Sequence, residues 1–136
     1  MTRKVLVATD GSSYAEKALR FALDEFPDAE TTVVHVVDSG QFSDEIPLDP
    51  TSDERMSHVS NMLADAEEFA EERGSEVETV CRIGEPSKEI VAHVKEEGFD
   101  HVVVGSRGKT GVRRMLLGSV AEGVVRNSPV PVTVVR

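Results

Sequence analysis

Apolar residues form two kinds of pattern that alternate along the whole chain. Some runs are short and mostly apolar without alternation, such as residues 4–8, which is typical of parallel strands buried on both faces, and residues 31–37 are interpreted as a second buried strand. Between them, apolar residues recur every three or four positions, as in amphipathic helices. The pattern predicts strands at residues 4–8, 31–37, 76–83, 100–104 and 130–135, and helices at residues 13–26, 51–74, 86–98 and 118–127.

Local signals agree with these elements. Ser13-x-x-Glu16 and Thr51-x-x-Glu54 are typical of capping boxes, and Pro86 fits the first turn of a helix. Five strands alternating with four helices predict an α/β fold with one domain over residues 1–136. Its open, Rossmann-like parallel sheet has right-handed crossovers and helices on both faces.

A glycine spacing after the fourth strand is the strongest indication of chemistry. The chain reads Gly105-x2-Gly108-x9-Gly118-Ser119, so a strand, a glycine loop and a new helix follow one another. Glycine lets main-chain N–H groups approach an anion closely, and a helix start adds free donors and a positive dipole end. This order predicts a phosphate cradle. In the alternative interpretation, the glycines only turn the chain and Ser119 is an ordinary N-cap.

Two other phosphate motifs are excluded by spacing. Gly108-Lys109-Thr110 is similar to the end of a Walker A loop, but Val103 stands where that loop needs its first glycine. The dinucleotide fingerprint G-x-G-x-x-G is also missing after the first strand, which continues into residues 8–12 (ATDGS).

Charge favours an anion site within an otherwise acidic chain. The formal net charge is −10, yet no acid occurs between Asp100 and Glu122. That window contains four cations, namely Arg107, Lys109, Arg113 and Arg114. The overall acidity argues against nucleic acid and anionic membranes as partners. No segment approaches the ~20 apolar residues of a membrane span, and the single cysteine, Cys81, fits a reducing cytoplasm.

The glycine motif, residues 5–12 (VLVATDGS) and residues 129–135 (PVPVTVV) together resemble the universal stress protein family over essentially the whole chain. The resemblance implies the strand order 3-2-1-4-5. It also implies binding of ATP or another adenine nucleotide, with Mg²⁺ carried by the nucleotide. A homodimer is implied as well, in which strand 130–135 pairs with its copy in a second subunit.

The resemblance also assigns residues to the nucleotide. It places Thr9 and Asp10 on the nucleoside, and it implies that the backbone of Val37 meets the adenine edge. A carboxylate at position 10 suits a ribose hydroxyl or an adenine amino group, although a turn aspartate that bonds its own backbone is the alternative. The glycines Gly105 and Gly108 are expected near the ribose and α-phosphate.

The remaining assignments concern the phosphates. Gly118, Ser119 and Val120 are expected to present N–H groups and a hydroxyl to the β- and γ-phosphates. Arg107 and Lys109 are the cations expected nearest the cradle. The polar loop at residues 38–50 is the expected lid near the adenine.

Residues suited to catalysis are scarce. We assign no catalytic residue and no metal site, because no His, Asp or Glu spacing indicates a positioned base or a metal. His35 is interpreted as a satisfied sheet residue, and His58 and His93 are expected away from the crevice. The sequence therefore predicts an adenine-nucleotide-binding regulatory protein with at most slow hydrolysis, acting on an unidentified downstream protein. An ATPase or phosphotransferase and a nucleotide-independent dimeric interaction module remain the alternatives.

Overall fold

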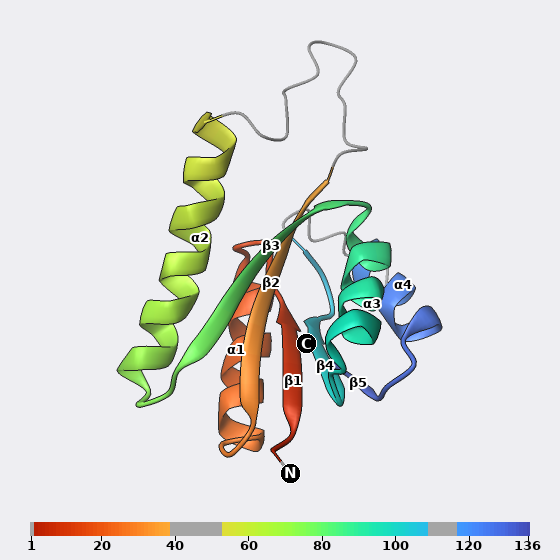
Figure 1. Cartoon of the computed structure of the whole chain (residues 1–136), viewed down its shortest axis with the longest axis horizontal. Helices are drawn as coiled ribbons and strands as arrows, with labels where there is room; N and C mark the ends of the chain where they lie inside the picture. The colour runs from red at the N-terminus through yellow and green to blue at the C-terminus, as the bar shows by residue number, and fades with distance from the viewer. Residues whose placement is uncertain (1, 39–52, 109–116) are drawn as a thin grey trace.

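A computed structural model describes residues 2–38, 53–108 and 117–136. Within these ranges, strands and helices alternate along the chain (Figure 1). The strands are β1 (Lys4–Ala8), β2 (Glu30–Asp38), β3 (Val77–Gly84), β4 (His101–Gly105) and β5 (Val132–Val135), and the helices are α1 (Ser13–Glu25), α2 (Asp53–Glu72), α3 (Pro86–Glu97) and α4 (Ser119–Asn127).

The strands form one parallel sheet in the order β3-β2-β1-β4-β5, which confirms the predicted fold class and strand order. β1 is central, and its residues Val5, Leu6 and Val7 are all 0% exposed. Consecutive side chains of a strand point to opposite faces, so a run without any exposure must be covered on both sides. The continuous apolar pattern of residues 4–8 therefore has its explanation in the position of β1.

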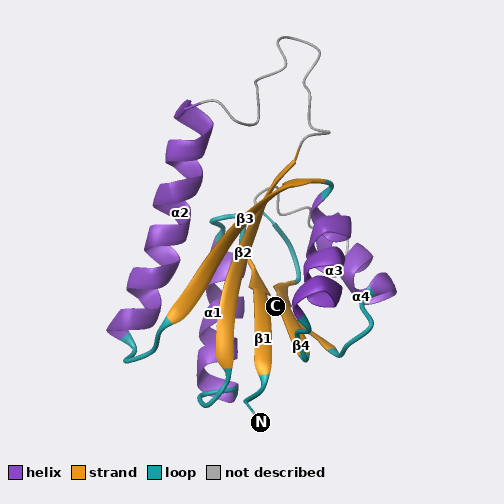
Figure 2. Cartoon of the chain, viewed as in Figure 1, coloured by secondary structure: helices purple, strands orange, loops and turns teal. Residues whose placement is uncertain are grey.

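Two apolar cores lie on the two faces of the sheet. One contains Val7 and Leu19 and is covered by α1 and α2, whereas the other contains Leu6 and Ile90 and is covered by α3 and α4. Figure 2 shows the two helix pairs on opposite sides of the sheet. Gly123 of α4 lies so close to α3 that a Cβ there would come within 2.6 Å of the Ser87 side chain. The N-terminal halves of α3 and α4 are thus held together.

Several element boundaries differ from the sequence prediction by one or two residues. The N-cap of α1 is Ser12, not Ser13, because the Ser12 hydroxyl accepts the N–H of Ala15 at 3.2 Å. The predicted cap Thr51 lies outside the described residues, and so do residues 39–50 of the predicted lid. Gly98 ends α3 in the left-handed conformation at φ 69°, as its sequence position predicted.

Strand β5 begins at Val132, not at Val130 as predicted. The carbonyl of Pro131 accepts the N–H of Val102 at 3.0 Å, but Pro131 has no N–H to donate. The strand therefore begins one residue later, at Val132. β5 is an edge strand, bonded only to β4 within the sheet. Its outer edge, formed by residues 132–135, is therefore open to pairing in the described chain.

A polar cluster joins the opposite edge strand β3 to α3. Arg82 of β3 donates to the Nδ1 atom of His93 at 3.0 Å and forms ion pairs with Glu96 at 2.9 Å and Glu89 at 3.5 Å. His93 is only 7% exposed. Because the Arg82 guanidinium can only donate, His93 must keep Nδ1 unprotonated to complete this contact.

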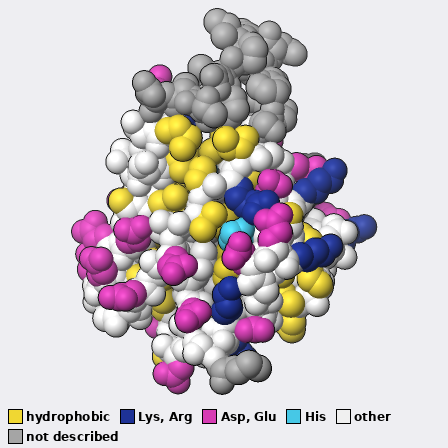
Figure 3. All heavy atoms as spheres, in the orientation of Figure 1, with side chains coloured by type: hydrophobic (Ala, Val, Ile, Leu, Met, Phe, Trp, Pro, Cys, Tyr) yellow, Lys and Arg dark blue, Asp and Glu magenta, His cyan; other side chains and the backbone are white. Residues whose placement is uncertain are grey.

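The charged surface is uneven. Exposed acidic side chains gather over α2, where Glu67, Glu68, Glu71 and Glu72 follow one another closely, and Figure 3 shows this acidic area on the face that it presents. Among the described residues, no helix is both long enough and apolar enough to be a candidate membrane span.

Two histidines, the buried His93 and the partly buried His101, lead to an expected dependence of stability on pH. Burial, and then the charge of Arg82, lowers the pKa of His93, while burial and Arg3 lower the pKa of His101, whose Nε2 contacts the Thr133 hydroxyl. The unfolded chain has histidine pKa values of about 6.5 and so binds more protons than the folded protein just below that pH. The free energy of unfolding is expected to be level above about pH 6.5 and to fall on acidification toward the lowered values.

Urea unfolding of the wild type and of His93→Asn at several pH values checks this expectation. The asparagine is able to offer Arg82 an acceptor oxygen close to the position of Nδ1 but does not titrate. We expect a smaller loss of stability in the variant on acidification. An equal loss in both proteins would show that His93 does not contribute to the pH dependence.

Candidate functional site

A cleft of about 660 Å³ opens at the carboxyl ends of β1, β2 and β4. This is where the strand order reverses, since the chain leaves β1 toward α1 on one face and α4 covers the other. Such a reversal is the usual ligand site of an open α/β sheet. Eight of the ten residues predicted for the site line this cleft, namely Thr9, Asp10, Val37, Gly105, Arg107, Gly108, Ser119 and Val120.

The turn after β1 is fixed by hydrogen bonds within itself. The N–H of Thr9 donates to the carbonyl of Val34 at 2.9 Å, and its hydroxyl accepts the N–H of Gly11 at 3.1 Å. Oδ1 of Asp10 accepts the N–H of Ser12 at 2.9 Å. Asp10 thus makes the local backbone contact expected of a turn aspartate, and its other oxygen lies toward the loop after β4.

The loop after β4 is packed against that carboxylate. A Cβ on Gly108 would lie 2.7 Å from Oδ2 of Asp10, so a larger residue here would require the carboxylate to move. A Cβ on Gly105 would lie 2.9 Å from the backbone carbonyl group of Tyr14, at the start of α1. Both glycines therefore have a packing role in addition to lining the cleft.

The start of α4 meets the same loop. The N–H of Gly118 donates to the carbonyl of Ser106 at 2.6 Å, and Ser106 donates its own N–H to Val135 at 2.7 Å. Gly118 is the N-cap of α4, so Ser119 is its first helical residue and not the cap that sequence reasoning considered. The N–H of Gly118 is occupied and Gly118 is not among the lining residues, whereas Ser119 and Val120 line the cleft at a helix start.

Basic side chains border the cleft from two sides. Arg107 lies on the loop after β4, and Arg55 and His58 come from α2 on the opposite side. The position of His58 corrects the expectation that it lies away from the crevice. Helical spacing places residues 55, 58 and 62 on one side of α2, but that side could not be matched to the cleft without the fold. The predicted cation Lys109 lies outside the described residues.

The C-terminal part of β2 also lines the cleft, next to Thr9. Val37 is 2% exposed and lines the cleft with the residues around it. His35 also lines the cleft, and its Nδ1 contacts the carbonyl of Thr9 at 2.8 Å. The interpretation of His35 as a sheet residue with a satisfied ring nitrogen is thus consistent with its contact, but its position at the cleft was missed.

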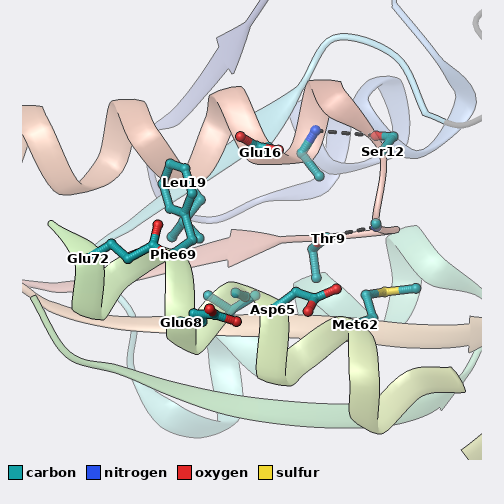
Figure 4. Close-up of a pocket in the computed structure, with 13 residues that line it drawn as sticks. Thr9, Ser12, Glu16, Leu19, Met62, Asp65, Glu68, Phe69 and Glu72 are labelled. Carbon is teal, nitrogen blue, oxygen red and sulfur yellow. Dashed lines mark hydrogen bonds between the residues drawn. The ribbon is translucent and has the colours of Figure 1, made fainter. Parts of the chain in front are cut away.

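A smaller hollow of about 270 Å³ lies between α1 and α2 (Figure 4). Leu19 and Phe69 give it an apolar wall, and carboxylates surround it, namely Glu16, Asp65, Glu68 and Glu72. Met62 and Thr9 border both this hollow and the main cleft. These four carboxylates repel a phosphate, and no Lys or Arg is among the described residues that line this hollow. In the main cleft, Arg55 and Arg107 accompany the carboxylates of Asp10, Asp38 and Glu85, so an anionic ligand is favoured there.

The described residues offer little beyond binding chemistry. They contain no group of three or more His, Cys, Asp or Glu side chains arranged to hold a metal ion. Burial raises the pKa of the Cys81 thiol, which disfavours the reactive thiolate. His93 is committed to Arg82 away from the cleft, as predicted for this residue.

Comparison with known proteins agrees with this fold. The model of the universal stress protein family matches residues 1–136. The universal stress protein YxiE of Bacillus subtilis is 37% identical over 148 aligned residues, covering 100% of both chains.

Solved structures agree. The structure of the hypothetical protein MJ0577, a universal stress protein of Methanocaldococcus jannaschii, superposes on this chain with a TM-score of 0.86 at 33% identity. The superposition covers 99% of this chain and 96% of that one. A universal stress protein of Archaeoglobus fulgidus in complex with dAMP has a TM-score of 0.76 at 27% identity, with coverage of 100% and 98%.

The glycine contacts predict that the same substitution has a large effect at one position and a small effect at another. Gly105→Ala places its methyl group 2.9 Å from the Tyr14 backbone, whereas in Gly118→Ala the nearest atom is the Cα of Arg107 at 3.4 Å. We expect Gly105→Ala to lower the free energy of unfolding by about 1–3 kcal/mol, as overpacking does. The matched control Gly118→Ala should change it by less than about 1 kcal/mol. Equal stabilities in chemical denaturation would contradict the close approach of β4 to α1.

Proposed function

This chain belongs to the universal stress protein family, and we propose that it binds an adenine nucleotide in the cleft beyond β1, β2 and β4 and acts as a regulatory protein. The observation that supports the proposal most directly is the meeting of the Thr9–Asp10 turn, Gly108 and the start of α4 in one cleft. The dAMP complex of the Archaeoglobus fulgidus relative supports an adenine nucleotide as the ligand.

The arrangement suits each part of such a ligand. The cleft reaches from the end of β2 to the start of α4, where Ser119 and Val120 favour a phosphate. Because Val34 directs its backbone groups toward β1, Val36 directs its own away from β3, so a base that lies beside Val37 would meet the backbone of Val36. Between these ends, the Asp10 carboxylate is placed to accept a hydrogen bond from the sugar or the base. A volume of about 660 Å³ is within the usual range for a small-molecule site.

The side chains of the cleft suit a binding and signalling role better than rapid hydrolysis of the nucleotide. The cleft provides cations and backbone donors, but His35 is engaged with Thr9 and His58 is an exposed residue at the border of the cleft. ATP with its own Mg²⁺ is part of the proposal, because a metal that arrives with phosphates keeps mostly water ligands. A cytoplasmic location is likewise proposed, supported by a single cysteine.

Isothermal titration of the purified protein with AMP, and with ATP and Mg²⁺, tests the proposed ligand. Gly118→Val directs branched methyl groups at the loop of residues 106–108, so we expect at least about a tenfold loss of affinity, about 1.4 kcal/mol. Gly118→Ala is the matched control and should bind nearly as well as the wild type. GMP should bind more weakly than AMP.

Two results would contradict the assignment. A folded wild-type protein that carries no nucleotide after gentle purification and binds none when titrated would favour the interaction-module alternative. Unchanged AMP affinity in a folded Gly118→Val variant would contradict a role of the 106–108 loop, and of its contact with the start of α4, in binding.

We further propose that β5 pairs with the same strand of a second subunit across a two-fold axis. Support comes from its position at the sheet edge and from Val125 of α4, which is 46% exposed although it is apolar. In a parallel ladder, a residue directs both its N–H and C=O to the same neighbour. Since Pro131 and Val135 accept from β4, Val132 and Val134 direct their backbone groups outward.

Val134→Pro tests this interface. It removes an outward N–H while leaving the bonds between β5 and β4 in place, so we expect a folded monomer. Val134→Ala keeps the N–H and should remain a dimer. Sedimentation velocity measures the mass of each variant, and a dimeric Val134→Pro protein would show that subunits associate through another surface.

A further inference from the structure

His35 makes a contact that the proposed binding function does not by itself require. Its Nδ1 lies 2.8 Å from the carbonyl oxygen of Thr9, in a partly buried position at the cleft. A carbonyl oxygen can only accept, so the imidazole must carry its proton on Nδ1 in this contact. The neutral ring with Nδ1–H and the imidazolium both satisfy this condition.

The bond is made where the first strand leaves the sheet. Thr9 directly follows β1, and its N–H still bonds to the carbonyl of Val34 in β2. Its carbonyl takes the side chain of the next β2 residue, His35. The peptide that joins Thr9 to Asp10 is thereby held at its oxygen, and its orientation determines where the Asp10 side chain begins.

A short series of contacts links that peptide to the Asp10 carboxylate and to the loop after β4. Asp10 accepts the N–H of Ser12 through Oδ1, and its Oδ2 packs closely against Gly108 of the opposite loop, where a Cβ would lie 2.7 Å from it. The Ser12 hydroxyl caps α1 by accepting the N–H of Ala15. A shift of the Thr9 carbonyl would therefore disturb the carboxylate at its contact with the glycine loop.

We propose that His35 is a positioning residue of the cleft, which orients the Asp10 carboxylate by donating its Nδ1–H to the carbonyl of Thr9. This inference rests on the proposed function for its effect on affinity, but the geometry it describes exists without ligand. His35 acts through Thr9 and does not itself need to touch the nucleotide.

The test compares two substitutions of His35. His35→Val suits a strand but leaves the Thr9 carbonyl without its donor, whereas His35→Asn carries an amide nitrogen about as far from the backbone as Nδ1. Titration with AMP should show a roughly fivefold to tenfold weaker affinity for the valine variant, as expected for one lost hydrogen bond. The asparagine variant should stay within about twofold of the wild type.

A double-mutant cycle with Asp10→Asn separates positioning from direct contact. If His35 acts through Asp10, the effect of His35→Val should shrink to less than about twofold in the Asp10→Asn background. Full additivity would show that His35 acts on the ligand independently and would overturn the inference. An unchanged AMP affinity of a folded His35→Val single variant would overturn it as well.

A ligand-free measurement keeps this inference distinct from the proposed function. Amide hydrogen exchange of Ser12 reports the bond to Oδ1 of Asp10 directly. Exchange should be faster in His35→Val and near wild-type in His35→Asn, even if the wild-type protein binds no AMP. In that case the proposed ligand would be wrong while the positioning role stands. Equal Ser12 protection in both variants would refute the positioning role.

Discussion

The burial of β1 between β2 and β4 is the constraint on which the rest of the structure depends. Val5, Leu6 and Val7 have no exposed surface, which requires a neighbour strand on each side and helices on both faces. With β1 central, the chain turns toward α1 on one face, while α4 covers the opposite one. The loops after β1 and β4 must then separate, and the cleft opens between them.

The cleft is preorganised by contacts within the chain. Gly108 leaves room for the Asp10 carboxylate, Gly105 leaves room for the backbone of Tyr14, and Gly118 is bonded to Ser106. Glycine in a binding loop is often explained by the approach of a ligand, but two of these glycines also have the chain itself as their close neighbour. A site whose groups are already held in place loses less entropy when a ligand binds.

The distribution of acidic and basic side chains agrees with an anionic ligand in the cleft. The chain has a formal net charge of −10, and α2 carries a dense acidic surface. The same helix nevertheless brings Arg55 to the cleft, opposite Arg107. Cations at a cleft on an acidic protein attract anions locally, while the acidic hollow between α1 and α2 repels them. Membership of the universal stress protein family and a relative bound to dAMP are consistent with this division.

The sequence by itself determined the elements, because a strand buried on both faces needs a continuous apolar run and a helix buried on one face needs an apolar residue every three or four positions. It also located the loop of Gly108, whose glycine spacing is local along the chain. Only the tertiary structure decided that His35 bonds to Thr9, that the Asp10 carboxylate fills the space beside Gly108, and that His58 borders the cleft. Periodicity tells which side of an element is buried, but contacts between elements far apart in sequence depend on how they pack together in space.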